Sequence, residues 1–139
     1  MFTNIIVPVD FSKSSIRTAK QAVTLAQKYD AALHLIHVIE PSETIPYPIH
    51  IELESYREQA HTSATEKMQA LVTELAYTNC KNTIAYGIPH TEINTYAKQH
   101  HIDLIMVAPH GKSGVERFFV GSVTDRLVRT SDCSILLVK

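Results

Sequence analysis

The sequence has no tryptophan, only two cysteines and only four glycines in 139 residues. Cys80 and Cys133 lie far apart and form no Cys-x-x-Cys pair, so neither a disulfide framework nor a cysteine-based zinc site is expected. Both thiols are interpreted as small core residues. Because glycine lets the backbone approach a ligand closely, the position of each rare glycine is informative.

An excess of one charge is also missing. Thirteen Lys and Arg residues balance fourteen Asp and Glu residues, and no long basic block occurs. A nucleic-acid binder normally carries a basic patch, so neither RNA nor DNA is an expected partner. No apolar stretch approaches the roughly 20 residues that cross a bilayer, and no cationic leader precedes the first apolar run. We therefore expect no membrane association and a cytoplasmic location.

Three common nucleotide motifs are absent. A Walker A loop needs glycine five residues ahead of Gly111-Lys112-Ser113, but Met106 occupies that position within an apolar segment. No Gly-x-Gly-x-x-Gly follows the first apolar run, which excludes the dinucleotide fingerprint. The segment PVDFS also lacks the Ser-Gly-Gly-x-Asp-Ser pattern of pyrophosphatase-type ATP enzymes. Adenylation chemistry is therefore disfavoured.

Eight histidines raise the question of a metal site. His34 and His37 fall on opposite faces of a predicted strand, and His100 and His101 are adjacent at a predicted helix end. Neither arrangement matches the geometry of a protein metal centre. We predict no protein-bound metal, and expect Mg or Mn only as an ion that accompanies bound phosphates.

What the sequence does contain is a regular alternation of apolar strands and amphipathic helices. Strands are predicted at residues 2–9, 32–39, 82–86, 103–107 and 134–138. Helices are predicted from a Ser12 N-cap to residue 29, along 54–75, from Pro89 onward and over 122–129. In the long 54–75 helix, apolar positions from Tyr56 to Leu75 are expected to form one buried face. This pattern predicts a single α/β domain, residues 1–139, with one open five-stranded parallel sheet and helices on both faces.

The segment from Asp103 to Thr124 has the layout of an anion site. An apolar strand leads into a glycine-containing loop, and a helix begins at Ser122. A helix N-terminus has free N–H groups and roughly half a positive elementary charge, which favours a phosphate. Ser122 and Thr124 have two interpretations here, since their hydroxyls suit either a phosphate or the helix cap.

The spacing of this loop resembles that of a known family. Ala108-Pro-His-Gly111, nine residues and then Gly121-Ser122 is similar to the nucleotide loop of the universal stress protein family, Gly-x-x-Gly, nine residues, Gly-Ser or Gly-Thr. The resemblance extends along the chain through IIVPVDFS, LHLIHVIE, YGIP and CSILLVK. Two positions differ: Ala108 replaces the first glycine, and Ser134 follows Cys133 where the family often has proline.

The resemblance implies a Rossmann-like fold of the adenine nucleotide α-hydrolase type, with strand order 3-2-1-4-5. Ligands of such sheets bind where the strand order reverses, here between the first and fourth strands. ATP is the implied cofactor: Pro8 and Asp10 would line the adenine and ribose, and Val38 would offer backbone groups to the adenine edge. From the residues alone, Asp10 is equally well interpreted as a helix cap. The site residues that the resemblance implies are Pro8, Val9, Asp10, Val38, Val107, Ala108, His110, Gly111, Gly121, Ser122, Val123 and Thr124.

The function that the resemblance implies is an ATP-binding stress-response module without a catalytic residue. One alternative is a slow ATPase, in which His110 would position water, although no placed general base is found. Another is a nucleotide-free dimeric interaction module, and the Ala108 replacement is the feature that favours it.

The last strand, Ser134–Val138, is the predicted edge of the sheet. Its apolar residues, Ile135 to Val138, occupy both faces, and an open apolar edge promotes aggregation. The resemblance implies that antiparallel pairing with a second copy covers this edge in a homodimer. A helix or loop packed over the edge is the alternative.

Overall fold

The computed structural model describes residues 1–41, 52–110 and 121–139. Gly111, one of the predicted site residues, lies outside these ranges. The strands are β1 (Asn4–Pro8), β2 (Ala32–Ile39), β3 (Cys80–Tyr86), β4 (Leu104–Val107) and β5 (Ser134–Leu137). The helices are α1 (Lys13–Tyr29), α2 (Glu52–Leu75), α3 (Pro89–Gln99) and α4 (Ser122–Thr130).

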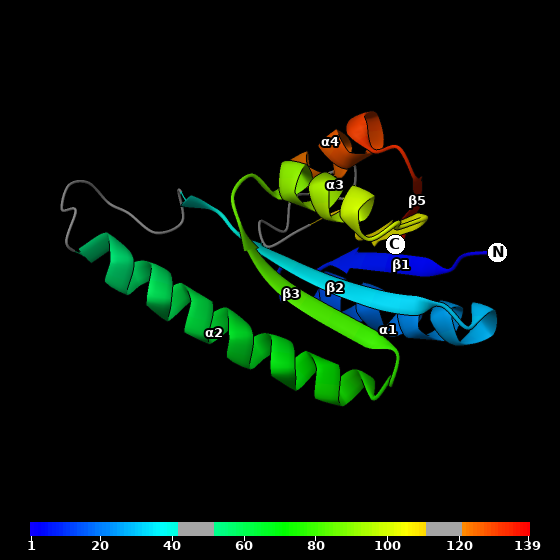
Figure 1. Cartoon of the computed structure of the whole chain (residues 1–139), viewed down its shortest axis with the longest axis horizontal. Coiled ribbons are helices and arrows are strands. Elements are labelled where there is room, and N and C mark those ends of the chain that lie inside the picture. Colours follow the sequence, from blue (N-terminus) through cyan, green and yellow to red (C-terminus); the bar gives the residue numbers. More distant parts are fainter. Residues whose placement is uncertain (42–51, 111–120) are drawn as a thin grey trace.

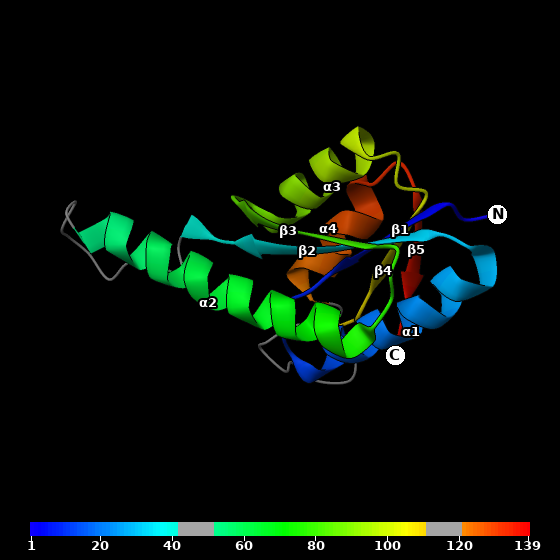
Figure 2. The same cartoon turned by 60° about the horizontal axis from the view of Figure 1, so that its bottom comes forward.

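The five strands form one parallel sheet in the order β3-β2-β1-β4-β5, which confirms the predicted fold class and strand order. Helices α1 and α2 cover one face, and α3 and α4 cover the other (Figures 1 and 2). The strand order reverses at β1, because the chain proceeds from β1 toward β3 and then crosses back to β4. The carboxyl ends of β1 and β4 therefore diverge into different loops, and a crevice opens between them.

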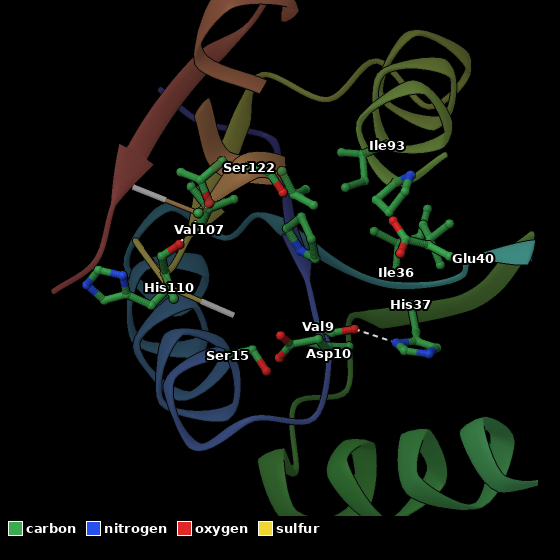
Figure 3. Close-up of a pocket in the computed structure, with 17 residues that line it drawn as sticks. Val9, Asp10, Ser15, Ile36, His37, Glu40, Ile93, Val107, His110 and Ser122 are labelled. Atoms are coloured by element: carbon green, nitrogen blue, oxygen red, sulfur yellow. Dashed lines mark hydrogen bonds between the residues drawn. The ribbon is translucent and has the colours of Figure 1, made fainter. Parts of the chain in front are cut away.

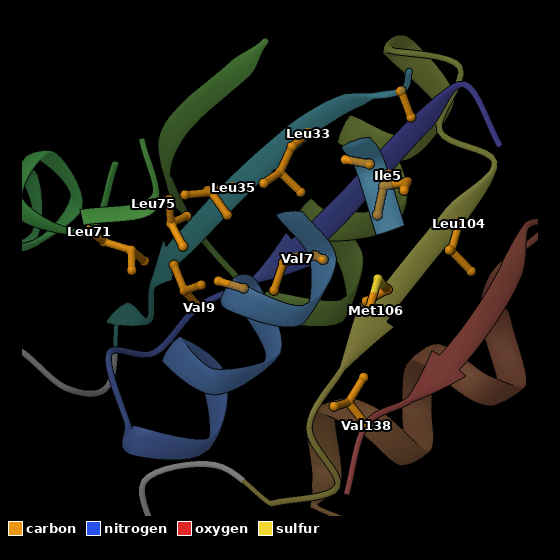
Figure 4. Close-up of a cluster of buried hydrophobic side chains, with 14 of the residues drawn as sticks. Ile5, Val7, Val9, Leu33, Leu35, Leu71, Leu75, Leu104, Met106 and Val138 are labelled. Carbon is orange, nitrogen blue, oxygen red and sulfur yellow. The ribbon is translucent and has the colours of Figure 1, made fainter. Parts of the chain in front are cut away.

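Each face of the sheet has its own apolar cluster. Ile5 and Val7 of β1 pack with α1 and α2, whereas Ile6 between them packs with α3 and α4. Figure 4 shows the first cluster, with Leu33 and Leu35 of β2 beside the β1 residues. Because both faces are covered, the central strands are apolar at nearly every position, which is why the sequence shows continuous runs rather than alternation.

Helix α1 begins where the sequence predicts. Ser12 is the N-cap, and its hydroxyl accepts a hydrogen bond from the backbone N–H of Ser15 at 3.3 Å. Ala19, Ala22 and Ala26 are fully buried against the sheet. These small side chains let α1 pack closely beneath β1, and its first turn lies beside the crevice.

Helix α2 differs from the prediction in its first half. Ala64, Met68 and Leu71 are buried, as expected, but Tyr56 is 45% exposed. Figure 1 shows the reason: the N-terminal end of α2 extends past the ends of β2 and β3. Along the apolar face, burial is therefore complete only from Ala64 onward, although His61 already stacks on Tyr86 of β3. In the described part of the chain, no helix combines the length and apolar character needed to cross a membrane.

Candidate functional site

A cavity of about 350 Å³ lies at the carboxyl ends of β1, β2 and β4, at the reversal of strand order. Every predicted site residue that the structure describes lines it. Those residues are Pro8, Val9, Asp10, Val38, Val107, Ala108, His110, Gly121, Ser122, Val123 and Thr124. The structure thus brings the predicted set together, and their contact with a nucleotide stays a prediction.

The backbone of Val38 faces this crevice. In a parallel sheet, alternate residues of a strand direct their N–H and C=O groups to opposite neighbours. The carbonyl of Ile36 accepts from Val9 N–H at 2.8 Å on the β1 side, and that of Ile39 accepts from Gly87 N–H at 3.1 Å on the β3 side. Val38 therefore directs both groups toward β1, beyond Pro8, the last β1 residue in register. One donor and one acceptor of the main chain meet the crevice there.

The N-terminus of α4 supplies the opposite end of the crevice. Gly121 is its N-cap, and its own N–H donates to the Pro109 carbonyl at 2.7 Å. The first helical hydrogen bond runs from Asp125 N–H to the Gly121 carbonyl at 2.9 Å. The N–H groups of residues 122–124 thus have no intrahelical acceptor. These three amides, rather than that of Gly121, are the donors available to an anion.

The side chain of Thr124 has a structural role. It is only 6% exposed, and its hydroxyl donates to the Ala108 carbonyl at 2.9 Å. This bond joins the first turn of α4 to the chain just after β4. The Thr124 hydroxyl hydrogen is therefore used within the protein, whereas the Ser122 side chain is exposed at the crevice.

Alanine at position 108 is compatible with its backbone. Among the described residues, Phe11, Asp30, Ala76 and His101 are the non-glycine residues with positive φ, and Ala108 is not one of them. A left-handed conformation is the one that would require glycine, so the Ala108 methyl group causes no backbone strain. Its remaining effect is to occupy space in the crevice.

Asp10 lies in the turn before α1 and lines the crevice, whereas Ser12 is the residue that caps the helix. The Asp10 Oδ1 accepts from Ser12 N–H at 3.0 Å in a turn that leads into α1. It also lies on the crevice floor between Ser15 and His37 (Figure 3). The turn depends on Phe11, whose φ of 63° is unusual for a bulky residue. The Phe11 ring packs against His37, with a centroid separation of 4.6 Å.

His37 joins the ends of β1 and β2. It is buried, and its Nδ1 lies 2.7 Å from the Val9 carbonyl oxygen. A carbonyl only accepts, so Nδ1 is the donor, which assigns the proton to that nitrogen. Together with the Phe11 packing, this bond supports the crevice floor.

His110 lines the crevice beside Ala108. Figure 3 shows its imidazole directed away from Asp10 and Ser122, and its backbone carbonyl accepts from the Ser14 hydroxyl at 3.0 Å. Its Nδ1 is buried and has no hydrogen-bond partner among the described residues. The alternative in which His110 positions water for hydrolysis stays a prediction. Over residues 1–41, 52–110 and 121–139, no group of three or more His, Cys, Asp or Glu residues could hold a metal ion.

Comparison with known proteins agrees with this geometry. The family model described as the universal stress protein family matches residues 1–139. The chain belongs to the universal stress protein family. Universal stress protein MJ0531 of Methanocaldococcus jannaschii is 29% identical over 142 residues, which cover all of this chain and 83% of that protein.

Two solved structures extend the family match to the fold. The structure of protein MJ0577, from the same archaeon, has a TM-score of 0.89 at 27% identity and is covered to 96%, with all of this chain aligned. Universal stress protein UspA from Lactobacillus plantarum has a TM-score of 0.76 at 32% identity, with 99% of this chain and 98% of that chain covered. The chain therefore has the fold of these universal stress proteins.

Six cavity residues were not identified from sequence. They are Ser15, Ile36, His37, Glu40, Pro89 and Ile93. The strand order offered a signal for two of them. Because β2 and β3 are parallel neighbours, the residue after β2, Glu40, and the first residue of α3, Pro89, must reach the same edge of the sheet. The other four, Ser15, Ile36, His37 and Ile93, cannot be told apart in the sequence from ordinary core or helix residues.

Proposed function

We propose that this universal stress protein binds an adenine nucleotide, ATP, in the crevice and acts as a stress-response regulatory module in the cytoplasm. The observation that carries the proposal is one cavity with two kinds of main-chain group. Val38 directs a donor and an acceptor into one end, and the first-turn amides of α4 meet the other end. Val38 suits a base edge, and the amides suit a phosphate.

The side chains between these ends fit a nucleoside. Ile36, Pro89 and Ile93 give an apolar wall on which a base can lie, and Asp10 lies on the floor where its carboxylate can accept from ribose hydroxyls. The α4 N-terminus contributes roughly half a positive charge toward the phosphates. A bound Mg or Mn ion would be held through those phosphates, since the described residues offer no metal cluster of their own.

Proteins of the same fold bind such ligands. One universal stress protein was solved in complex with cAMP, at 22% identity and a TM-score of 0.66. Another, from Archaeoglobus fulgidus, was solved in complex with dAMP, at 16% identity and a TM-score of 0.65. These identities establish the likeness of fold alone, and the two complexes support adenine nucleotides as the ligand class to test here.

Calorimetric titration of ATP, with and without Mg²⁺, into the wild type and a Gly121→Val variant tests the proposal. Gly121 has φ −58° and ψ 153°, a conformation open to valine, so the variant keeps its backbone and adds bulk at the phosphate end. Saturable binding by the wild type and a loss of at least about tenfold in affinity in the variant are expected. Absence of saturable binding to the wild type, or equal affinity in both proteins, would refute the proposal.

We also propose that the protein forms a homodimer through β5. This edge strand exposes Leu136 and Leu137, and the neighbouring α4 exposes Val128. An exposed apolar edge strand is a template for pairing with another chain, and a two-fold antiparallel pair would cover it.

A further inference from the structure

We propose that the Glu40 carboxylate accepts a hydrogen bond from the exocyclic amine of the bound base, and so selects adenine over hypoxanthine. This inference rests on the proposed nucleotide function and assigns base selectivity to one side chain. Glu40 lies at the base end of the crevice, the end opposite Ser122 and His110 in Figure 3.

Glu40 is placed there by the register of β2. The strand ends at Ile39, so Glu40 is the first residue beyond it and lies two positions after Val38. Side chains two apart on a strand point to the same face, so Glu40 follows Ile36 and Val38 toward the α3 side. Figure 3 shows Glu40 beside Ile36 and Ile93, and all three line the cavity.

Among the described residues, no side chain or backbone group pairs with the Glu40 carboxylate. Glu40 is half-buried, and within residues 1–41, 52–110 and 121–139 it forms no hydrogen bond or ion pair. The nearby Ile36, Pro89 and Ile93 side chains have no polar atoms that could satisfy it. Partial burial of an unpaired carboxylate costs free energy, which a donor on a ligand would recover.

The main chain and a side chain contribute separately to base selectivity. A neighbouring N–H and C=O, as in Val38, fit adenine through its N1 acceptor and N6 donor. Hypoxanthine presents the reverse order, an N1–H donor and an O6 acceptor, so it fits the same pair only if the base shifts or turns over. Adenine also keeps a second N6 hydrogen for a further acceptor, whereas hypoxanthine has no amine. A carboxylate near the Val38 pair therefore adds selectivity to that of the backbone.

The test compares ATP with inosine triphosphate, which differs from ATP at the base alone. Calorimetric titration of the wild type should show ATP binding at least about tenfold more tightly than the inosine nucleotide. Glu40→Ala removes the acceptor and should reduce this ratio by roughly tenfold to a hundredfold, the range expected for one hydrogen bond to a charged group. Glu40→Gln is the matched control, because its amide oxygen still accepts a hydrogen bond, and it should preserve most of the ratio.

The ratio of the ATP affinity to the inosine triphosphate affinity separates base selectivity from changes that affect both nucleotides. Removing a negative charge near an anionic ligand changes the affinity for both triphosphates alike, and so does partial loss of folding. An equal change for both nucleotides in Glu40→Ala, or a wild type with no preference for ATP, would overturn the role of Glu40 while leaving the proposed function intact. A wild type that binds neither nucleotide would instead refute the proposed function. Tighter binding of GTP than of ATP would overturn the adenine assignment.

Discussion

The Thr124 hydroxyl donates to the Ala108 carbonyl at 2.9 Å and joins two segments that are 16 residues apart. Ala108 follows β4 directly, and Thr124 lies in the first turn of α4. A second bond, from Gly121 N–H to the Pro109 carbonyl, connects the same two segments. The amides proposed to bind phosphate are thus positioned relative to the sheet by bonds from their own helix end.

Replacing Thr124 with valine should therefore destabilise the protein. Valine keeps the shape but removes the hydroxyl, so the free energy of unfolding should fall by about 1–2 kcal/mol. Urea denaturation measures this change. Thr124→Ser retains the hydroxyl and should lose less stability than the valine variant. If serine costs as much as valine, the hydrogen bond is not the source of the effect.

Acid should destabilise the fold through His34. Burial, then Lys81, then His100 lower the pKa of His34 from 6.5 to about 4, and its ring is 1% exposed. Its Nδ1 lies 3.0 Å from the Tyr96 hydroxyl, and its buried Nε2 has no hydrogen-bond partner among the described residues. Between pH 6.5 and 4 the unfolded chain binds a proton that the folded protein excludes. Stability is thus fully present above pH 6.5 and falls as the pH is lowered, by about 2 kcal/mol at pH 5.

A His34→Gln variant tests this pH dependence, because glutamine does not titrate. Urea denaturation at pH 7.5 and at pH 5 gives the loss of unfolding free energy on acidification for each protein. This loss should be about 2 kcal/mol smaller in the variant than in the wild type. Parallel profiles for the two proteins would show that His34 does not cause the acid sensitivity.

Two single substitutions of Phe11 can be compared to test its positive φ. Phe11→Ala and Phe11→Gly both remove the ring that packs on His37 and that lies 5.8 Å from the Lys67 ammonium. At φ 63°, alanine retains the left-handed strain and glycine relieves it. Both variants should be less stable than the wild type, with Phe11→Gly more stable than Phe11→Ala by about 1 kcal/mol in thermal or urea unfolding. Greater stability of the alanine variant would contradict the left-handed geometry.

The proposed dimer can be tested by substituting two exposed apolar residues at opposite edges of the sheet. Light scattering should give the wild type twice the mass of one chain, and Leu136→Lys should give a single chain with unchanged circular dichroism. Ile88→Lys is the matched control: Ile88 is 58% exposed but follows β3, at the other edge. A monomeric wild type, or equal dissociation by both substitutions, would exclude the β5 interface.

The fold was predictable because its signals are local and repeated. Continuous apolar runs predicted strands buried on both faces, and the Ser12 cap and alanine spacing predicted α1. Boundaries moved where pairing decides them: β3 begins at Cys80, two residues before the predicted Asn82, because Leu33 of β2 pairs with Cys80. Tyr56 was wrongly expected in the core, since helical periodicity does not reveal where the sheet beneath a helix ends.

The sequence predicted which chain segments form the site, but it did not predict all of the side-chain and backbone contacts within it. Loop spacing located Gly121 and Ser122 at the crevice, but it did not reveal that the Gly121 N–H donates to the Pro109 carbonyl. Glu40 was missed although the strand order places it at this edge of the sheet, because one carboxylate after a strand resembles any surface residue. Such features depend on contacts between distant segments, which neither spacing nor periodicity encodes.

The proposed adenine nucleotide contacts the Val38 backbone and the first-turn amides of α4 at the same time. Titration of ATP into ¹⁵N-labelled protein, followed by amide chemical shifts, measures this directly. We expect saturable shifts with one common dissociation constant at the amides of Val38, Ser122, Val123 and Thr124, while the distant Leu75 amide stays unchanged. Saturable binding that leaves these four amides unshifted would contradict the proposed contacts.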